Sequence, residues 1–275
     1  MRLLTISLLI SLSFLFSGCY LNEPAPKPVP ERVAEGVTLE NIAVGDWTRA
    51  EVIGLLNELA QANNTPPVNS GFSLETGEII ESRPGKSLNY EATLQRVFQA
   101  SPGTNVTAVY DPVAPAITTE QVREARRLGS YVTEIKDTSP GRLHNIELTA
   151  ALINNTWIEP GQEFSFNRLT GEPTAERGFQ PATIFTADGQ SQGLGGGMCQ
   201  VSSTLYNAVL EAGLPVTERH PHSQPVTYVP PGRDATTYTD KDFRFRNSLR
   251  QPLLVQVLVI RTPPTVNVHI WQLAK

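Results

Sequence analysis

The sequence predicts an α+β protein with a central helix that starts at Cys199 and packs on an antiparallel sheet. Apolar residues recur at helical spacing between Val201 and Ala212, directly after a run of glycines. Gly213 then permits the left-handed turn that ends many helices. Strand-like segments lie before and after this helix without alternating regularly with further helices, which favours α+β over a doubly wound sheet.

The N-terminus has the features of a lipoprotein signal peptide. Arg2 gives a short basic start, and the uncharged apolar stretch 3–16 is shorter than the roughly 20 apolar residues that span a bilayer. The sequence Phe16-Ser17-Gly18-Cys19 resembles the lipobox of bacterial lipoproteins, in which the cysteine is lipidated and becomes the mature N-terminus. We therefore expect residues 1–18 to be removed and Cys19 to anchor the exported protein to a bacterial membrane, facing the cell wall or periplasm. An ordinary secretory signal is the alternative.

Residues 19–35 are rich in proline and form a predicted extended tether. The chain has two cysteines, so lipidation of Cys19 leaves Cys199 as the free thiol and excludes an intramolecular disulfide. A lone thiol in an oxidising compartment is a liability unless it is buried or used. The formal net charge is −5, and removing residues 1–18 takes away only Arg2, which leaves −6. This mild acidic balance argues against nucleic acid as a partner.

Residues 36–127 are predicted to form a small module of strands and helices. They contain no histidine, no cysteine and no glycine-rich phosphate loop, which favours a binding or spacer module over a catalytic one. The expected elements are a strand over 36–44, a turn and cap at Gly45 and Asp46, a helix over 47–62, extended segments at 72–74 and 78–80, a helix over 89–99, a strand over 105–110 and a short helix from Thr118.

Residues 128–275 form the second predicted domain, which contains the Cys199 helix. Its segment 216–229 contains Pro221 and Pro225, which indicate an edge strand because proline cannot donate to a sheet ladder. The other expected elements are a strand over 131–135, a helix over 142–155, strands over 163–167 and 182–190 with a hairpin turn at Asp188-Gly189, and strands over 242–247, 252–260 and 266–272.

Cys199 is the candidate nucleophile because a helix N-terminus favours the thiolate. A buried cysteine in a tight turn is the alternative. Gly195, Gly196 and Gly197 would let a substrate backbone approach the thiol, and N–H groups around Cys199 and Gln200 would face a developing oxyanion. Ser202 is assigned to the same oxyanion and substrate loop. A merely flexible glycine loop is the other interpretation.

The candidate base and orienting group follow in the sequence. His220 and His222 point to the same face of an extended chain, and Asp234 follows after a proline-glycine turn. We prefer His222 as the base because it precedes the longer extended segment and is less crowded by Arg219, which leaves His220 to line the cleft. This order of groups is similar to the papain and transglutaminase architectures.

Two further interpretations concern ligands of this region. Arg142 and Arg233 are candidates to bind a substrate carboxylate. Cys199, His220, His222 and Asp234 are also four potential zinc ligands, but the short-spaced cysteine pairs or HExxH motif of common zinc sites are missing. We expect neither a metal nor another cofactor.

Four stretches resemble the VanW domain family and together span most of residues 130 to 255: RLHNIELTAALINNTWIEPGQEFSFN, GLGGGMCQVSSTLYNAVLEAGL, HSQPVTYVPPGRDAT and FRFRNSL. Met198 stands where isoleucine or valine is common. The family's name comes from glycopeptide resistance clusters. Residues 36–127 resemble the peptidoglycan-binding domain that often precedes VanW.

The resemblance implies a cell-envelope protein that acts on peptidoglycan stem peptides. As an L,D-transpeptidase, Cys199 would attack the carbonyl of the third stem residue, release D-alanine and pass the acyl group to an amine of a neighbouring stem, forming a 3→3 cross-link. His222 would be the base and Asp234 its orienting group. A non-enzymatic peptidoglycan-binding protein, or a cysteine peptidase or amidase that hydrolyses the same stems, are the alternatives.

Overall fold

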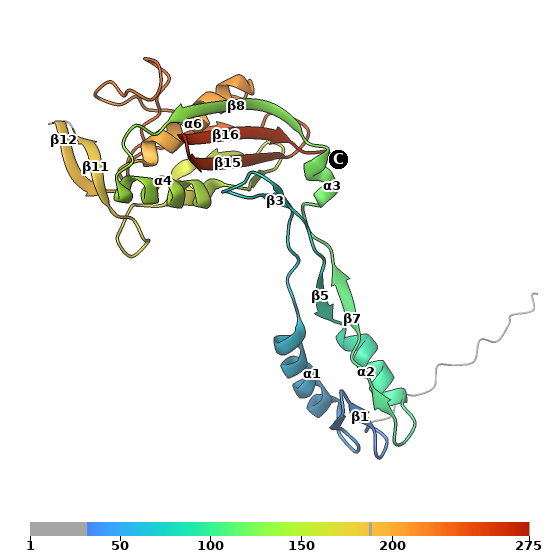
Figure 1. Ribbon diagram of the computed structural model, residues 1–275. Helices are drawn as coiled ribbons and strands as arrows, with labels where there is room; N and C mark the ends of the chain where they lie inside the picture. Colours follow the sequence, from blue (N-terminus) through green and yellow to red (C-terminus); the bar gives the residue numbers. More distant parts are fainter. Residues whose placement is uncertain (1–31, 187–188, 275) are drawn as a thin grey trace, which may run out of the picture. The chain divides into compact units, whose positions relative to one another are not determined.

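The computed structural model describes residues 32–186 and 189–274, which form a mixed α+β fold (Figure 1). The predicted signal peptide, Cys19 and residues 20–31 of the tether lie outside the described residues. Within the part that is described, no helix is long and apolar enough to cross a membrane.

The chain divides into two compact units that interleave along the sequence. The smaller contains residues 32–56 and 90–109, and the larger contains 57–89 and the chain from residue 110 onward. Each unit is therefore discontinuous, whereas the predicted modules meet at one boundary after residue 127.

The smaller unit contains a small sheet and the helix α2 (Tyr90–Gln99), as predicted. The strand expected over 36–44 is instead a hairpin of β1 (Thr38–Leu39) and β2 (Ile42–Ala43), because Glu40 and Asn41 adopt positive φ angles of 50° and 67° and reverse the chain. β6 (Asn105–Val106) pairs in parallel with β1.

The helix α1 (Arg49–Asn63) begins one turn later than its expected cap. Thr48 caps it, since Glu51 N–H donates to the Thr48 hydroxyl and the Glu51 carboxylate accepts from Thr48 N–H in return. Asp46, the expected cap, lies in the preceding turn with φ 65°.

A four-stranded antiparallel sheet forms the centre of the larger unit, in the order β8-β16-β15-β9 (Figure 1). α4 and α6 pack against each other and against one face of this sheet, which confirms the central helix on an antiparallel sheet. That face is apolar because alternate residues such as Val255, Val257 and Val268 are buried. The bounds are β8 (Arg126–Glu134), α4 (Pro140–Ile153), β9 (Thr156–Ile158), α6 (Met198–Glu211), β15 (Leu253–Arg261) and β16 (Pro264–Gln272).

Part of the predicted N-terminal module packs onto this sheet. Phe72 stacks on Trp271 with 5.4 Å between ring centroids, and the Asn155 side chain bonds both the N–H and the carbonyl of Phe72. Leu254 and Val122 belong to the same buried cluster. The elements concerned are the hairpin β3 (Gly71–Phe72) and β4 (Ile79–Ile80), and α3 (Thr119–Arg123), whose predicted start is confirmed by a capping box at Thr118.

Smaller sheets complete the larger unit. The expected strand over 163–167 ends at Ser165, which caps the short helix α5 (Phe166–Thr170). The expected strand over 105–110 is interrupted, since β7 starts at Tyr110 as a separate strand. The remaining strands are β5 (Gly85–Leu88) with β7 (Tyr110–Val113), β11 (Pro181–Thr186) with β12 (Gly189–Leu194), and β10 (Glu163–Ser165) with β14 (Arg244–Arg246) and β13 (Val216–Glu218).

The edge strand predicted over 216–229 is wrong beyond its first residues. β13 ends at Glu218, and residues 219–229 form no strand. The physical reason is the loss of donors: Pro221 and Pro225 have no N–H, and the N–H of His222 donates to the Asp234 carboxylate at 2.6 Å instead of to a neighbouring strand.

Candidate functional site

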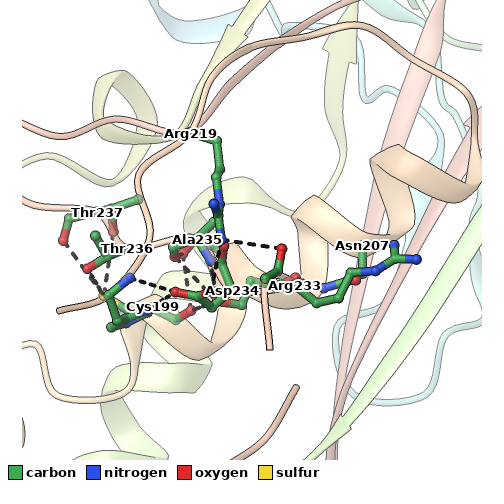
Figure 2. Close-up of polar contacts among 12 residues, drawn as sticks. Cys199, Asn207, Arg219, Arg233, Asp234, Ala235, Thr236 and Thr237 are labelled. Atoms are coloured by element: carbon green, nitrogen blue, oxygen red, sulfur yellow. Dashed lines mark hydrogen bonds and ion pairs between the residues drawn. The ribbon is translucent and has the colours of Figure 1, made fainter. Parts of the chain in front are cut away.

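Cys199 is the second residue of α6, as the helix-start prediction requires. Gly197 caps the helix with φ 115°, a conformation that strongly favours glycine. The thiol is partly exposed, donates to the Thr237 carbonyl at 3.7 Å and lies 3.6 Å from the Thr236 hydroxyl (Figure 2). Neither threonine was a predicted site residue.

His222 and Asp234 are joined as the sequence analysis expected. Nδ1 of His222 lies 2.7 Å from Oδ2 of Asp234, and both side chains are largely buried. A carboxylate at Nδ1 holds the proton on that nitrogen, which leaves Nε2 as the acceptor of the neutral ring.

The electrostatics connect this pair to the thiol. Burial alone would raise the pKa of Cys199, but a hydrogen bond and charge interaction with His222 outweigh it and lower the pKa from 9.0 to about 7. Burial likewise opposes the charged imidazole, yet the interactions with Cys199 and Asp234 raise the pKa of His222. Each interaction stabilises the charged form of its partner, so the thiolate and the imidazolium stabilise each other.

Arg219 positions Asp234, a role that the sequence analysis did not assign. Its Nε donates to the Asp234 carbonyl at 2.6 Å, and its Nη2 donates to Oδ1 at 2.8 Å (Figure 2). The guanidinium also lies over the Tyr206 ring, 5.5 Å from its centroid. Both the backbone and the side chain of Asp234 are thus fixed by one residue.

Ser202 does not face a substrate, because its side chain is fully buried. Its hydroxyl donates to the Ala235 carbonyl at 2.5 Å, and the Ala235 N–H donates to Ser203 at 2.9 Å. The predicted substrate-loop role of Ser202 is therefore wrong. The two serines attach the segment next to Asp234 to the first turn of α6.

The glycine loop is closely packed, which contradicts the flexible-loop interpretation. A Cβ on Gly196 would lie 2.5 Å from the Thr183 carbonyl, and the Gly196 carbonyl accepts from Asn145. The N–H of Gln200, predicted to face an oxyanion, donates to the Gly197 carbonyl at 3.0 Å. The backbone N–H of Cys199 lies in the first turn of α6, where N–H groups have no partner within the helix.

His220 and Arg233 are not brought to the thiol. Nε2 of His220 bonds Glu218 at 2.9 Å. Arg233 is exposed, and Figure 2 shows its side chain extending away from Cys199. The four potential zinc ligands therefore do not converge, and residues 32–186 and 189–274 contain no group of three or more histidine, cysteine or acidic side chains suited to a metal.

Arg142 lies in a pocket of about 290 Å³, together with Gln200 and Tyr228. Its Nη2 donates to the Gln200 side chain at 2.9 Å. The Tyr228 ring packs edge-on against His222, with 6.5 Å between centroids. Tyr228 was missed because it was assigned to the strand predicted over 216–229, although it lies in a stretch on which the family resemblance was based.

Known proteins resemble a large part of this chain. A family model described as VanW like protein matches residues 141–271. Uncharacterized protein YoaR of Bacillus subtilis (strain 168) is 36% identical over 207 residues, which cover 73% of this chain and 68% of that protein. Vancomycin B-type resistance protein VanW of Enterococcus faecalis (strain ATCC 700802 / V583) is 32% identical over 82 residues, 30% of each chain.

No solved structure matches the chain, so the expected likeness to papain and transglutaminase has no support from a known fold. The matched segment 141–271 contains Cys199, His222 and Asp234. The family match and the relative aligned over two thirds of its length together establish that this chain belongs to the VanW family.

Proposed function

We propose that this chain is a cysteine acyltransferase that acts on peptidoglycan stem peptides as an L,D-transpeptidase. The observation that carries the proposal is the network of Cys199, His222 and Asp234, in which the thiol pKa is about 7. The substrate class is inferred from the family, one member of which is named for vancomycin resistance.

In the proposed reaction, the Cys199 proton passes to His222 and the thiolate attacks the carbonyl carbon of the third stem residue. The tetrahedral oxyanion accepts a hydrogen bond from the Cys199 N–H. The C–N bond then breaks, the imidazolium gives its proton to the departing D-alanine amine, and a thioester remains. An amine of a second stem attacks this thioester, its proton passes to His222, and the new amide bond releases the thiolate.

The cellular setting is part of the proposal. An exported chain, anchored by lipid on Cys19 and extended by the tether 19–35, would hold the thiol near the cell wall. The segment 36–127 would bind peptidoglycan.

The test is muropeptide analysis after incubation of the full chain, in detergent, with sacculi rich in tetrapeptide stems. New 3→3 dimers are expected with the parent chain and none with Cys199→Ala. His220→Ala is the matched control and retains activity, because its ring bonds Glu218. If His220→Ala forms no dimers, the choice of His222 over His220 as the base is contradicted.

The same experiment separates the alternatives. Monomeric tripeptides without dimers would indicate hydrolysis, since transfer and hydrolysis share the acyl-enzyme and differ in the acceptor. Unchanged muropeptides with both chains would indicate a binding protein in which the thiol has no catalytic role.

A further inference from the structure

The pocket that contains Arg142 has charges that the proposed triad does not use. Its lining includes two cations, Arg142 and Lys136, and two carboxylates, Glu134 and Asp137. In the described parts of the chain, no carboxylate forms an ion pair with either cation. Opposite charges thus line one pocket without direct ion pairs, although the charge of Arg142 helps to lower the pKa of Asp137.

Both cations are held in place by neutral acceptors. Arg142 donates to the amide oxygen of Gln200, whose own amide donates to Thr133 and to the Glu134 carbonyl. Nε of Arg142 is buried without an acceptor, and Lys136 donates to the Thr227 carbonyl at 3.3 Å. A guanidinium fixed in this way, with one buried donor lacking an acceptor, favours a carboxylate ligand.

The pocket adjoins the reacting thiol. Gln200 follows Cys199 in α6, and its side chain lines the pocket. Tyr228 lines the pocket and contacts His222. Burial raises the pKa of Tyr228, the Cys199 charge raises it further, and Arg142 opposes this rise. Tyr228 therefore connects the pocket with His222.

The mixed charge of the pocket matches a group that carries both signs on one carbon. We propose that the pocket binds an α-amino carboxylate, with its carboxylate at Arg142 and Lys136 and its ammonium at Glu134 and Asp137, and that this amine is the acyl acceptor. The assignment rests on the proposed acyltransferase function. Two sources carry this chemistry: a free amino acid, and the free end of a diamino-dicarboxylic acid side chain in a neighbouring stem.

In the transfer step, the acceptor amine replaces the Cys199 sulfur at the carbonyl carbon. The bound ammonium loses one proton through a pocket carboxylate to solvent. The amine nitrogen then forms a bond to the thioester carbonyl carbon, the C–S bond breaks, and the second nitrogen proton passes to His222. The Cys199 thiolate leaves, and the imidazolium–thiolate pair is restored.

Two tripeptide stems that differ by one carboxylate test this ligand. One has meso-2,6-diaminopimelate as its third residue, and the other has L-lysine, which lacks the carboxylate beside the side-chain amine. Binding to the full-length Cys199→Ala chain is measured by calorimetry in detergent, where no turnover occurs. We expect the diaminopimelate tripeptide to bind about tenfold more tightly, because a charged hydrogen-bonded pair is lost with lysine.

Substitutions of the pocket cations test whether the preference for the diaminopimelate tripeptide arises in this pocket. Arg142→Gln and Lys136→Gln each reduce the preference, and Arg142→Lys, which keeps the charge, retains part of it. Arg250→Gln, an exposed arginine outside the pocket lining, leaves it unchanged. Competition with free alanine distinguishes the sources: displacement at similar concentration indicates a free amino acid, and weak displacement indicates the stem.

Equal binding of the two tripeptides, absence of binding, or a preference that survives both Arg142→Gln and Lys136→Gln would overturn the proposal. A tenfold preference in a chain whose parent forms no 3→3 dimers would instead overturn the acyltransferase function and leave the ligand of the pocket supported.

Discussion

At the scale of single residues, the Asp234 carboxylate has a defined partner at each oxygen. Oδ2 accepts from both the backbone N–H and Nδ1 of His222, and Oδ1 accepts from Arg219. Burial opposes the charged carboxylate, but the bonds to His222 outweigh it and lower the pKa of Asp234. The imidazole therefore has an ionised orienting group throughout the neutral range.

The ionisation of Cys199 depends on His222, and this dependence can be measured. The rate of iodoacetamide labelling of the Cys199 peptide should rise with pH around a midpoint near 7. In His222→Ala the midpoint should rise, because only the hydrogen bonds with Thr237 and Thr236 then oppose the effect of burial. Mass spectrometry of the digested chain separates this peptide from Cys19. Equal labelling midpoints in the parent chain and in His222→Ala would show that His222 does not lower the pKa of Cys199.

Replacing Asp234 tests the orienting group. Asp234→Asn should lower the rate of cross-link formation by on the order of 10²–10⁴, because the amide favours the wrong tautomer of His222. Asp240→Asn, at an exposed position, is the matched control and should keep the parent rate. A full rate in Asp234→Asn, measured by the yield of 3→3 dimers over time, would remove Asp234 from the mechanism.

The sequence predicted that Cys199 starts a helix and that Asp234 pairs with His222, because residue type and chain order restrict the candidates strongly, and the structure confirms both placements. The sequence did not predict that four further residues lie near this site: Arg219, Tyr228, Thr236 and Thr237. Their closeness to the triad depends on the path of residues 219–237, which have no hydrophobic periodicity from which that path could be read.

At the scale of elements, the N-terminus of α6 is held by its neighbours rather than by its own sequence. The Asn145 amide of α4 donates to the Gly196 and Gln180 carbonyls and accepts from the Gln180 N–H. Asn145 is fully buried, so these bonds are formed away from water. The glycine loop is thereby fixed to α4 directly before Cys199.

Gly196→Ala tests how closely this loop is packed. The new Cβ would lie 2.5 Å from the Thr183 backbone carbonyl, so the loop must move, and we expect a loss of about 1–3 kcal/mol in the free energy of unfolding. Gly54→Ala, in a helix with open space around it, should instead gain about 0.5–1 kcal/mol. Urea unfolding measures the free energy of unfolding of both variants. Equal changes in Gly196→Ala and Gly54→Ala would contradict the close packing of the glycine loop.

Elements with strong periodicity were predicted well, including α2, α4, α6 and the strands β15 and β16. The secondary-structure predictions failed where polar side-chain contacts replace the regular backbone pairing of strands. The segment 219–229 has the composition of a strand, but its prolines and the capture of the His222 N–H by Asp234 prevent one.

At the scale of the molecule, a buried acidic residue connects segments of the larger unit that are far apart in the sequence. Asp242 accepts from the Ser165 hydroxyl at 2.6 Å, from the Asn167 N–H and from Arg244. Burial would raise the pKa of Asp242, but these bonds lower it. Its contribution to stability is therefore present above the unfolded pKa of about 3.9 and is lost as pH falls through the lower folded value.

The free energy of unfolding should accordingly decrease below about pH 4. Asp242→Asn should cost about 2 kcal/mol at pH 7 and should flatten this acid dependence, because the titrating group is gone. Urea unfolding followed by tryptophan fluorescence between pH 7 and pH 3 checks both effects, with Asp240→Asn as control. An unchanged pH slope in Asp242→Asn would exclude this carboxylate as a cause.

The division into two units was not predictable from linear composition, because each unit is assembled from separated stretches. Residues 71–80 look like part of an N-terminal module, yet Phe72 and Asn155 attach them to the large sheet. Such pairing depends on side chains far apart in the sequence, which local patterns do not report.

The hydrogen bonds of Ser202 and Ser203 with Ala235 join α6 to the segment that follows Asp234. Cys199 precedes the two serines in α6 and Asp234 precedes Ala235, so these bonds limit how far the thiol and the carboxylate can separate. The rate at which the Ala235 amide exchanges with solvent deuterium therefore measures how often this contact opens.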